Sequence, residues 1–177
     1  MFQRCQMWQD HVKEGCFPDC DMLPLGKLGG GFGHGEWDCR FTKEEQKTMM
    51  TLWCMFRSPL MIGAELTRLD DWTLSLLTNQ ELLSLMNENC QGMQLVLNDK
   101  RAVWKNKNYK TGALYVALFN LNDAEDVISI ALSELEETLA EKDYSLSELW
   151  DKSQTHTKQG RIEAVIPAHG VKVYHIL

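Results

Sequence analysis

Two aspartates, two residues apart, are the side chains of this 177-residue sequence best suited to chemistry. Asp19 and Asp21 lie in the run FPDCDMLPLG, residues 17–26. On a β-strand, residues i and i+2 point to the same side, so both carboxylates would face one way and Met22 the other. Two carboxylates on one face are unfavourable unless a cation, an arginine or a substrate hydroxyl satisfies them. The run therefore predicts a functional surface.

The same residues allow other interpretations. An Asp-x-Asp pair is also suited to a divalent cation that holds a nucleotide sugar, because hard cations prefer oxygen ligands. Either aspartate could instead cap backbone N–H groups at a strand end. We expect a binding role for Asp21 and a supporting hydrogen bond for Asp19.

A zinc site is a further alternative nearby. Four cysteine and histidine side chains suffice for structural zinc, and this region offers Cys16, Cys20, His34 and Cys39. Their spacing is irregular, which favours ordinary thiols.

The first half of the chain alternates between helical and strand patterns. That order predicts two parallel strands joined by right-handed crossovers. The expected elements are a helix over 2–13, a strand over 21–25, a glycine-rich loop over 26–41, a helix from 42 to 58, a doubly buried strand over 59–63, and a helical region over 70–85.

Capping residues mark the predicted helix starts. Thr42 and Glu45 form the pattern of a capping box, and Pro59 stops the helix that they open. Asp70 or Asp71 is expected to cap the next helix. Thr78 with Glu81 is expected to cap its continuation.

After residue 92 the pattern changes to short apolar runs separated by turn residues, which predicts an antiparallel β-sandwich. We place a domain boundary near residue 92. The expected strands contain residues 95–97, 102–104, 114–119, 127–131, 146–150, 162–166 and 171–176.

Composition excludes several partners. The net charge is −7 and no long basic cluster occurs, so nucleic acid and anionic membranes are not expected to bind. No apolar run approaches the ~20 residues that a membrane helix needs. All six cysteines lie within the first 90 residues, a pattern that favours reduced thiols, and with no signal peptide at residue 1 we expect a cytoplasmic protein.

Several motifs occur in one order along the chain: FPDCDML (17–23), RFTKEEQKTMMTLW (40–53), RSPLMIG (57–63), LLTNQE (76–81) and IPAHGVKVY (166–174). In this order they resemble the C-terminal part of the α-galactosidases of glycoside hydrolase family 27. The resemblance covers nearly the whole chain.

The resemblance implies a fold and an activity. Residues 1–92 would be the C-terminal portion of a (β/α)₈ barrel, a partial TIM-barrel α/β segment of about two parallel strands and three helices. Residues 93–177 would be the all-β antiparallel sandwich. The implied reaction is hydrolysis of terminal α-galactosides with retention, which needs a nucleophile and an acid/base carboxylate. Both lie on earlier barrel strands in the family, so we expect this chain alone to be inactive, and we expect no cofactor or metal.

The resemblance also assigns site residues and partners. Asp21 and Met22 match positions that line the sugar pocket, and Asp19 matches an acidic position that supports the strand. The family usually has Trp where this chain has Phe17, and a small residue or proline where it has Cys20. Expected partners are an α-galactoside or another glycan, and either the missing N-terminal half of the barrel or a second copy. The alternative is a non-catalytic carbohydrate-binding or assembly module.

Overall fold

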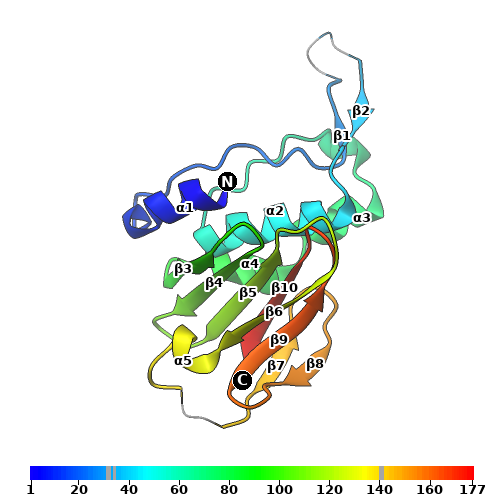
Figure 1. The fold of residues 1–177 in the computed structure, drawn as a ribbon. Coiled ribbons are helices and arrows are strands. Elements are labelled where there is room, and N and C mark those ends of the chain that lie inside the picture. Colours follow the sequence, from blue (N-terminus) through cyan, green and yellow to red (C-terminus); the bar gives the residue numbers. More distant parts are fainter. Residues whose placement is uncertain (31–32, 34, 140–141) are drawn as a thin grey trace.

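The computed structural model describes residues 1–30, 33, 35–139 and 142–177, which form three layers. Helices cover one face of a six-stranded sheet, and a two-stranded sheet covers the other face (Figure 1). Every paired strand is antiparallel to its neighbour. The six-stranded sheet has the order β3 (Cys90–Leu97), β4 (Arg101–Asn108), β5 (Leu114–Asn120), β10 (Val171–Ile176), β7 (Ser145–Glu148) and β8 (Gln154–His156). The small sheet pairs β6 (Asp126–Ala131) with β9 (Arg161–Ile166).

The central strands are buried on both faces, and their side chains divide by alternation. In β5, Ala117 and Phe119 pack under the helices, whereas Val116 and Leu118 face the small sheet. Trp104 of β4 lies opposite Ala117, so a large side chain meets a small one across the strands. This period of two explains why the sequence indicates a sandwich here, and that prediction is confirmed.

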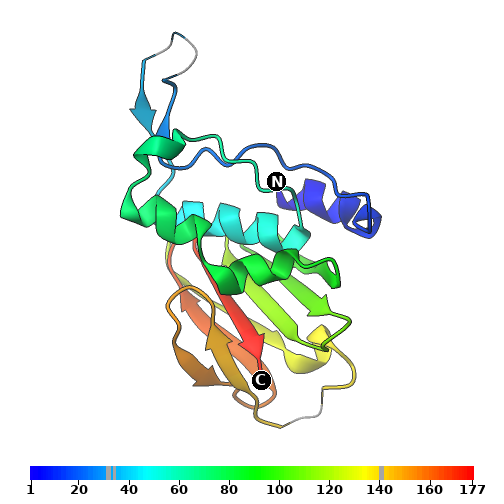
Figure 2. The same cartoon turned by 180° about the vertical axis from the view of Figure 1, so that it is seen from behind.

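The helical layer consists of short helices around one long one. The elements are α1 (Phe2–Trp8), a 3₁₀ turn (Gln9–His11), α2 (Lys43–Phe56), a 3₁₀ turn (Leu66–Arg68), α3 (Asp71–Leu77), α4 (Gln80–Leu83) and a 3₁₀ turn (Ser84–Met86). A further short helix, α5 (Leu132–Leu135), follows β6. Helix α2 lies across the sheet in both views (Figure 2).

The predicted caps are mostly confirmed. The Thr42 hydroxyl accepts the Glu45 N–H at 3.2 Å, and the Glu45 carboxylate accepts the Thr42 N–H at 2.7 Å. Asp70 caps α3 by accepting the Thr73 N–H at 2.6 Å. Asn79 caps α4, so the prediction of Thr78 is wrong by one residue.

Helix α2 meets the sheet at very close range. A Cβ added to Gly92 of β3 would lie 1.7 Å from the carbonyl oxygen of Met55. The buried Asn106 amide lies 3.4 Å from that same oxygen. The helical layer and the sandwich are therefore in direct backbone contact.

Two predictions for the first half are wrong. The expected parallel strands over 21–25 and 59–63 do not form as regular strands, because only Leu23 and Ile62 make a parallel bridge. Ile62 is also 36% exposed rather than buried. With no parallel sheet in the described residues, a partial TIM-barrel segment is not evident. The glycine-rich loop instead contains a short hairpin, β1 (Lys27–Leu28) with β2 (Trp37–Asp38), which projects from the body (Figure 1).

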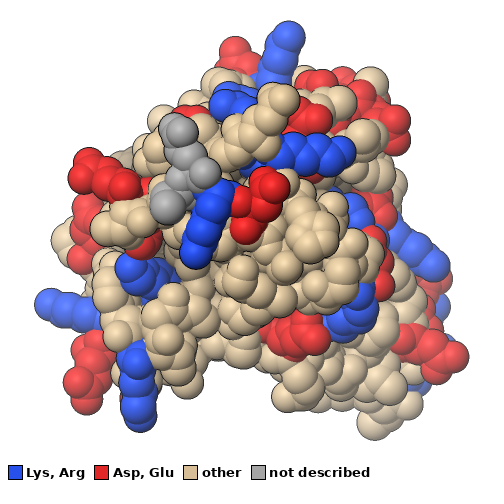
Figure 3. Space-filling model, turned by 90° about the horizontal axis from the view of Figure 1, so that it is seen from below, with Lys and Arg blue, Asp and Glu red and all other residues tan. Residues whose placement is uncertain are grey.

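Within the described ranges, no helix is both long enough and apolar enough to cross a membrane. On the face seen from below, acidic and basic side chains are interspersed with uncharged ones (Figure 3).

Candidate functional site

The segment that carries Asp21 is fixed to the end of helix α2. The Cys20 N–H donates to the Ser58 hydroxyl at 2.9 Å. The Trp53 indole N–H donates to the Asp21 carbonyl oxygen at 3.0 Å. Each anchor comes from a residue of α2 or of the turn after it, so the helix sets the position of both aspartates.

Further along the segment, backbone hydrogen bonds hold the chain in place. The Leu23 N–H donates to the Met61 carbonyl at 2.7 Å, and the Gly63 N–H donates to the Leu23 carbonyl at 2.9 Å. The side chains of Leu23 and Leu25 are fully buried. Their burial holds this part of the chain against the helical core.

Asp21 itself is not in a strand conformation. Its φ of +76° lies in the left-handed region, which aspartate tolerates better than most residues. The Asp19 carboxylate accepts the Asp21 N–H, and the Asp21 carboxylate accepts the Met22 N–H, both at 2.7 Å. The expectation that both carboxylates project from one strand face is therefore wrong, because each caps the local backbone.

Asp19 and Asp21 nevertheless border one cavity. It has a volume of about 620 Å³ and lies between α1 and residues 16–21. Arg4 and His11 line the same cavity and provide basic groups near the exposed carboxylates. Met22 is not among its lining residues; its side chain is 56% exposed and packs beside Gly63. Sugar binding by Asp21 and Met22, and support by Asp19, stay predictions.

The described residues offer no metal centre at this cavity. No group of three or more His, Cys, Asp or Glu side chains in the described ranges is placed to hold an ion. His34, one of the four residues of the zinc alternative, lies outside the described residues. The thiol beside Cys20 belongs to Cys5, a residue that the zinc alternative did not include.

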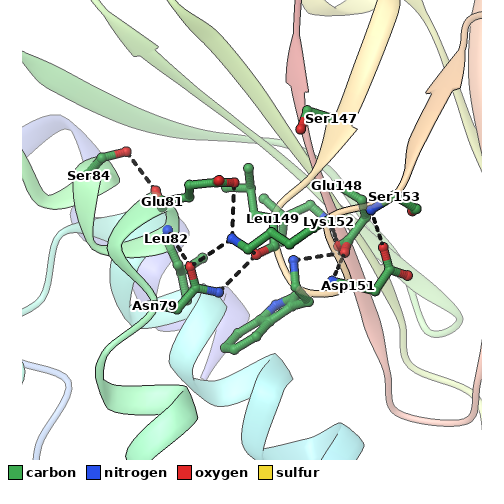
Figure 4. A network of polar contacts seen from close by, with 12 residues as sticks. Asn79, Glu81, Leu82, Ser84, Ser147, Glu148, Leu149, Asp151, Lys152 and Ser153 are labelled. Atoms are coloured by element: carbon green, nitrogen blue, oxygen red, sulfur yellow. Dashed lines mark hydrogen bonds and ion pairs between the residues drawn. The ribbon is translucent and has the colours of Figure 1, made fainter.

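A second polar site lies between the helical layer and the sandwich (Figure 4). It borders a groove of about 610 Å³ and is built around the turn after β7. The buried Glu148 carboxylate accepts backbone N–H groups from Trp150 (2.8 Å), Asp151 (2.6 Å) and Val173 (3.1 Å). The turn is thereby fixed to the neighbouring strand β10.

The other half of this network joins the turn to helix α4. The Asn79 amide and the Lys152 ammonium both donate to the Leu149 carbonyl oxygen at 2.9 Å. Lys152 also forms a 3.1 Å ion pair with Glu81. On α2, the Thr51 hydroxyl accepts the Trp150 indole N–H at 3.1 Å. Since these polar groups bond to one another, the network is suited to joining the two layers.

Two carboxyl groups of this network titrate differently. Burial raises the pKa of Glu148 above its ordinary value, despite the backbone N–H groups that favour its charged form. For Asp151, burial also acts to raise the pKa, but hydrogen bonds from Lys172 and Ser153 outweigh it, and the pKa lies well below its ordinary value. Glu148 is not among the site residues predicted from the sequence, although it shares a strand face with the buried Leu146 two residues earlier.

Comparison with known proteins identifies the class. Residues 98–176 match the family model described as the alpha galactosidase C-terminal beta sandwich domain. Over nearly its whole length, the chain is related to the C-terminal part of α-galactosidases and other glycoside hydrolase family 27 proteins, so the predicted family is confirmed.

Three relatives illustrate this relation. A family 27 β-L-arabinopyranosidase from Geobacillus stearothermophilus is 36% identical with a TM-score of 0.89, covering 99% of this chain and 40% of that one. A putative α-N-acetylgalactosaminidase from Bacillus halodurans is 34% identical with a TM-score of 0.86, covering 99% and 42%. Alpha-galactosidase 2 of Arabidopsis thaliana is 26% identical over 170 residues, 94% of this chain and 39% of that protein. The chain thus spans well under half of each relative.

Proposed function

We propose that this chain supplies the C-terminal part of an α-galactosidase-like retaining glycoside hydrolase that acts on terminal α-galactosides. The observation that carries the proposal is the alignment of 99% of the chain with a family 27 enzyme at 36% identity and a TM-score of 0.89. In this proposal, residues 1–92 complete a (β/α)₈ barrel and residues 93–177 form the sandwich that follows it.

The backbone around Leu23 supports the barrel assignment. Leu23 and Ile62 make a parallel bridge, and further along the Glu65 N–H donates to the Lys27 carbonyl oxygen at 2.8 Å. Helix α2 connects the two segments. This is the β–α–β order of neighbouring barrel strands, whose ladder would extend when a further strand pairs with their open edges.

The proposed role of the Asp21 segment is to form one wall of the sugar pocket. An exposed carboxylate beside a cavity is suited to accept hydrogen bonds from sugar hydroxyls, and such bonds to a charged group are stronger than neutral ones. Asp19 would hold Asp21 in place through the hydrogen bond to its N–H. Met22 would contribute apolar contact from its exposed side chain.

Catalysis would require residues other than these. A retaining glycosidase needs two carboxyl groups about 5–5.5 Å apart on either side of the glycosidic bond. Asp19 and Asp21 match neither member of the family's catalytic pair, and both already cap local backbone. We therefore propose that the 177-residue chain alone is inactive.

A second substrate class has support of its own. The solved relative of 36% identity is a β-L-arabinopyranosidase. L-arabinopyranose has the ring hydroxyl arrangement of galactose without the hydroxymethyl group, so one pocket wall would suit both sugars.

The test uses the purified chain with two chromogenic substrates, nitrophenyl α-D-galactopyranoside and nitrophenyl β-L-arabinopyranoside. We expect no hydrolysis of either above the buffer rate, and measurable turnover would overturn the inactivity. Calorimetric titration with galactose and with L-arabinose then measures binding, with Asp21→Asn as the test variant and Glu163→Gln, an exposed change on β9, as its control. Equal heats for the test variant and the wild type would exclude Asp21 as a sugar ligand.

The alternative function is a non-catalytic carbohydrate-binding or assembly module. Large apolar side chains on the first 41 residues favour a polypeptide partner, since Trp8, Phe17 and Met22 are each more than half exposed. Light scattering at micromolar concentration distinguishes the cases: an assembly module that pairs with itself gives a dimer or larger species, whereas a clean monomer contradicts self-association.

A further inference from the structure

Two buried cysteines from separate elements are in contact. The Sγ atoms of Cys5, in helix α1, and Cys20, next to Asp21, are 3.6 Å apart. Their residues are 1% and 7% exposed, and all six cysteines of the chain are free thiols in this structure. No hydrogen bond joins any other two thiols in the described part of the chain.

We propose that Cys5 and Cys20 form a reversible disulfide that ties helix α1 to the segment carrying Asp19 and Asp21. A disulfide bond is about 2 Å long, so the sulfur atoms must approach by roughly 1.5 Å, a distance within the reach of side-chain rotation. The inference rests on the two thiols alone and does not depend on sugar binding.

The environment of the pair sets the direction of attack. The hydrogen bond shared with the Cys5 thiol lowers the pKa of Cys20, and the Ser58 hydroxyl acts in the same direction against the effect of burial. The hydrogen bond shared with Cys20, together with burial, raises the pKa of Cys5. Cys20 is also the more accessible of the two residues, 7% exposed against 1%, so it is the thiol that attacks as the thiolate.

The oxidant is a small-molecule disulfide, such as oxidised glutathione. The Cys20 thiolate attacks one of its sulfurs, forms a mixed disulfide and releases one thiolate. Cys5 then loses its proton and attacks the Cys20 sulfur, which forms the Cys5–Cys20 bond and releases the second thiolate. Two protein thiols are oxidised, one external disulfide is reduced to two thiols, and the protons of Cys5 and Cys20 end on those thiols.

The cavity described above provides access for this exchange. Cys5, Cys20 and the exposed Cys16 all line it. Cys16 therefore competes with Cys5 for a disulfide with Cys20. We expect Cys16 to stay a free thiol, because it lies outside the 3.6 Å contact between the other two.

The experiment equilibrates the purified chain with mixtures of reduced and oxidised glutathione, then alkylates and maps the peptides by mass spectrometry. We expect the six reactive thiols of the denatured chain to fall to four, with one cross-linked peptide pair containing Cys5 and Cys20. Closing this short loop should raise the melting temperature by roughly 5–10 °C, reversed by dithiothreitol. Cys5→Ser and Cys20→Ser should each abolish the cross-link and the shift, whereas Cys16→Ser, the matched control, should keep both.

Three results would overturn the proposal. They are six free thiols at every glutathione ratio, a cross-link that includes Cys16, and a mixed disulfide at Cys20 that never resolves onto Cys5. Each is measured on the wild-type chain, so a variant that fails to fold changes none of them.

Discussion

The sandwich and the Asp21 segment are stabilised in different ways. In the sandwich, eight strands pair through antiparallel ladders, and two apolar clusters fill both faces of the large sheet. The described residues between 12 and 41 form a hairpin of two short strands and two isolated β-bridges. The part around Asp21 depends on single hydrogen bonds, such as those from Cys20 to Ser58 and from Trp53 to Asp21. The sandwich therefore tolerates the loss of one hydrogen bond. The same loss removes a large share of the contacts that hold the Asp21 segment.

This difference separates the stable sandwich from the candidate site. Exposed carboxylates, a cavity and a left-handed aspartate all lie in the sparsely anchored region. Regions with few buried contacts open at lower free energy than ladder-bonded cores. A candidate site anchored this way would adapt to a ligand more easily than the sandwich.

The most severe test of the comparison is Gly92→Ala in β3. The new Cβ would lie 1.7 Å from the Met55 carbonyl oxygen, so helix α2 must move off the sheet. We expect the free energy of unfolding to fall by about 3 kcal/mol or more, measured by urea denaturation. Gly35→Ala is the control, because nothing lies within 4 Å of its added Cβ. A loss below about 1 kcal/mol would show that the two layers are not held at this contact.

Glu148→Gln tests the network that joins the layers. An amide has one oxygen and one NH₂ group, so it cannot accept all three N–H bonds that the carboxylate accepts. At least one buried N–H loses its partner, and we expect a loss of about 2 kcal/mol at pH 7. Glu163→Gln, exposed on β9, should change stability little. Equal stabilities for the two variants would contradict a structural role for Glu148.

Sequence patterns predict the sandwich well because the burial of its side chains follows a short, regular repeat along each strand. Strands such as β5 and β9 alternate or run apolar over six or seven residues, and the period of two survives folding. Strand β8 is not predicted, because it contains no apolar residue: its residues are Gln154, Thr155 and His156. Only its pairing with β7 makes this segment a strand. The boundary near residue 92 stays a prediction.

The Asp21 segment is predicted less well for the opposite reason. Its conformation is decided by contacts with Trp53 and Ser58, which lie more than 30 residues away in the chain. The apolar run over 59–63 predicts a buried strand, but its partners here leave Met61 and Ile62 exposed. Residue type alone locates the carboxylates that border the cavity, whereas their geometry depends on these distant contacts.

Trp53→Phe tests how the Asp21 segment is anchored to helix α2. It removes the indole N–H that donates to Asp21 and keeps an aromatic ring in the core. The lost hydrogen bond should lower local stability by about 1 kcal/mol. Hydrogen exchange should therefore quicken at residues 20–23 and stay unchanged in β4 and β5. The exposed Trp8→Phe is the control, and uniform protection in both variants would contradict anchoring by Trp53.

Asp70→Asn gives the smallest expected effect and carries a pH dependence. Asp70 caps α3, and its hydrogen bond from the Thr73 N–H lowers the pKa of its carboxyl. A carboxyl with a lowered folded-state pKa stabilises the protein above its unfolded pKa of about 4, and the contribution disappears as the pH falls through the folded pKa.

Asparagine keeps the capping oxygen but loses the charge at the helix start. Because the side chain is exposed and screened, we expect a loss of only about 0.5 kcal/mol at pH 7. The difference between wild type and variant should shrink toward zero as the pH falls through the lowered folded-state pKa of Asp70, measured by urea denaturation at a series of acid pH values. A difference that stays constant down to acid pH would mean that the charge of Asp70 contributes nothing, and that this helix start depends on hydrogen bonding alone.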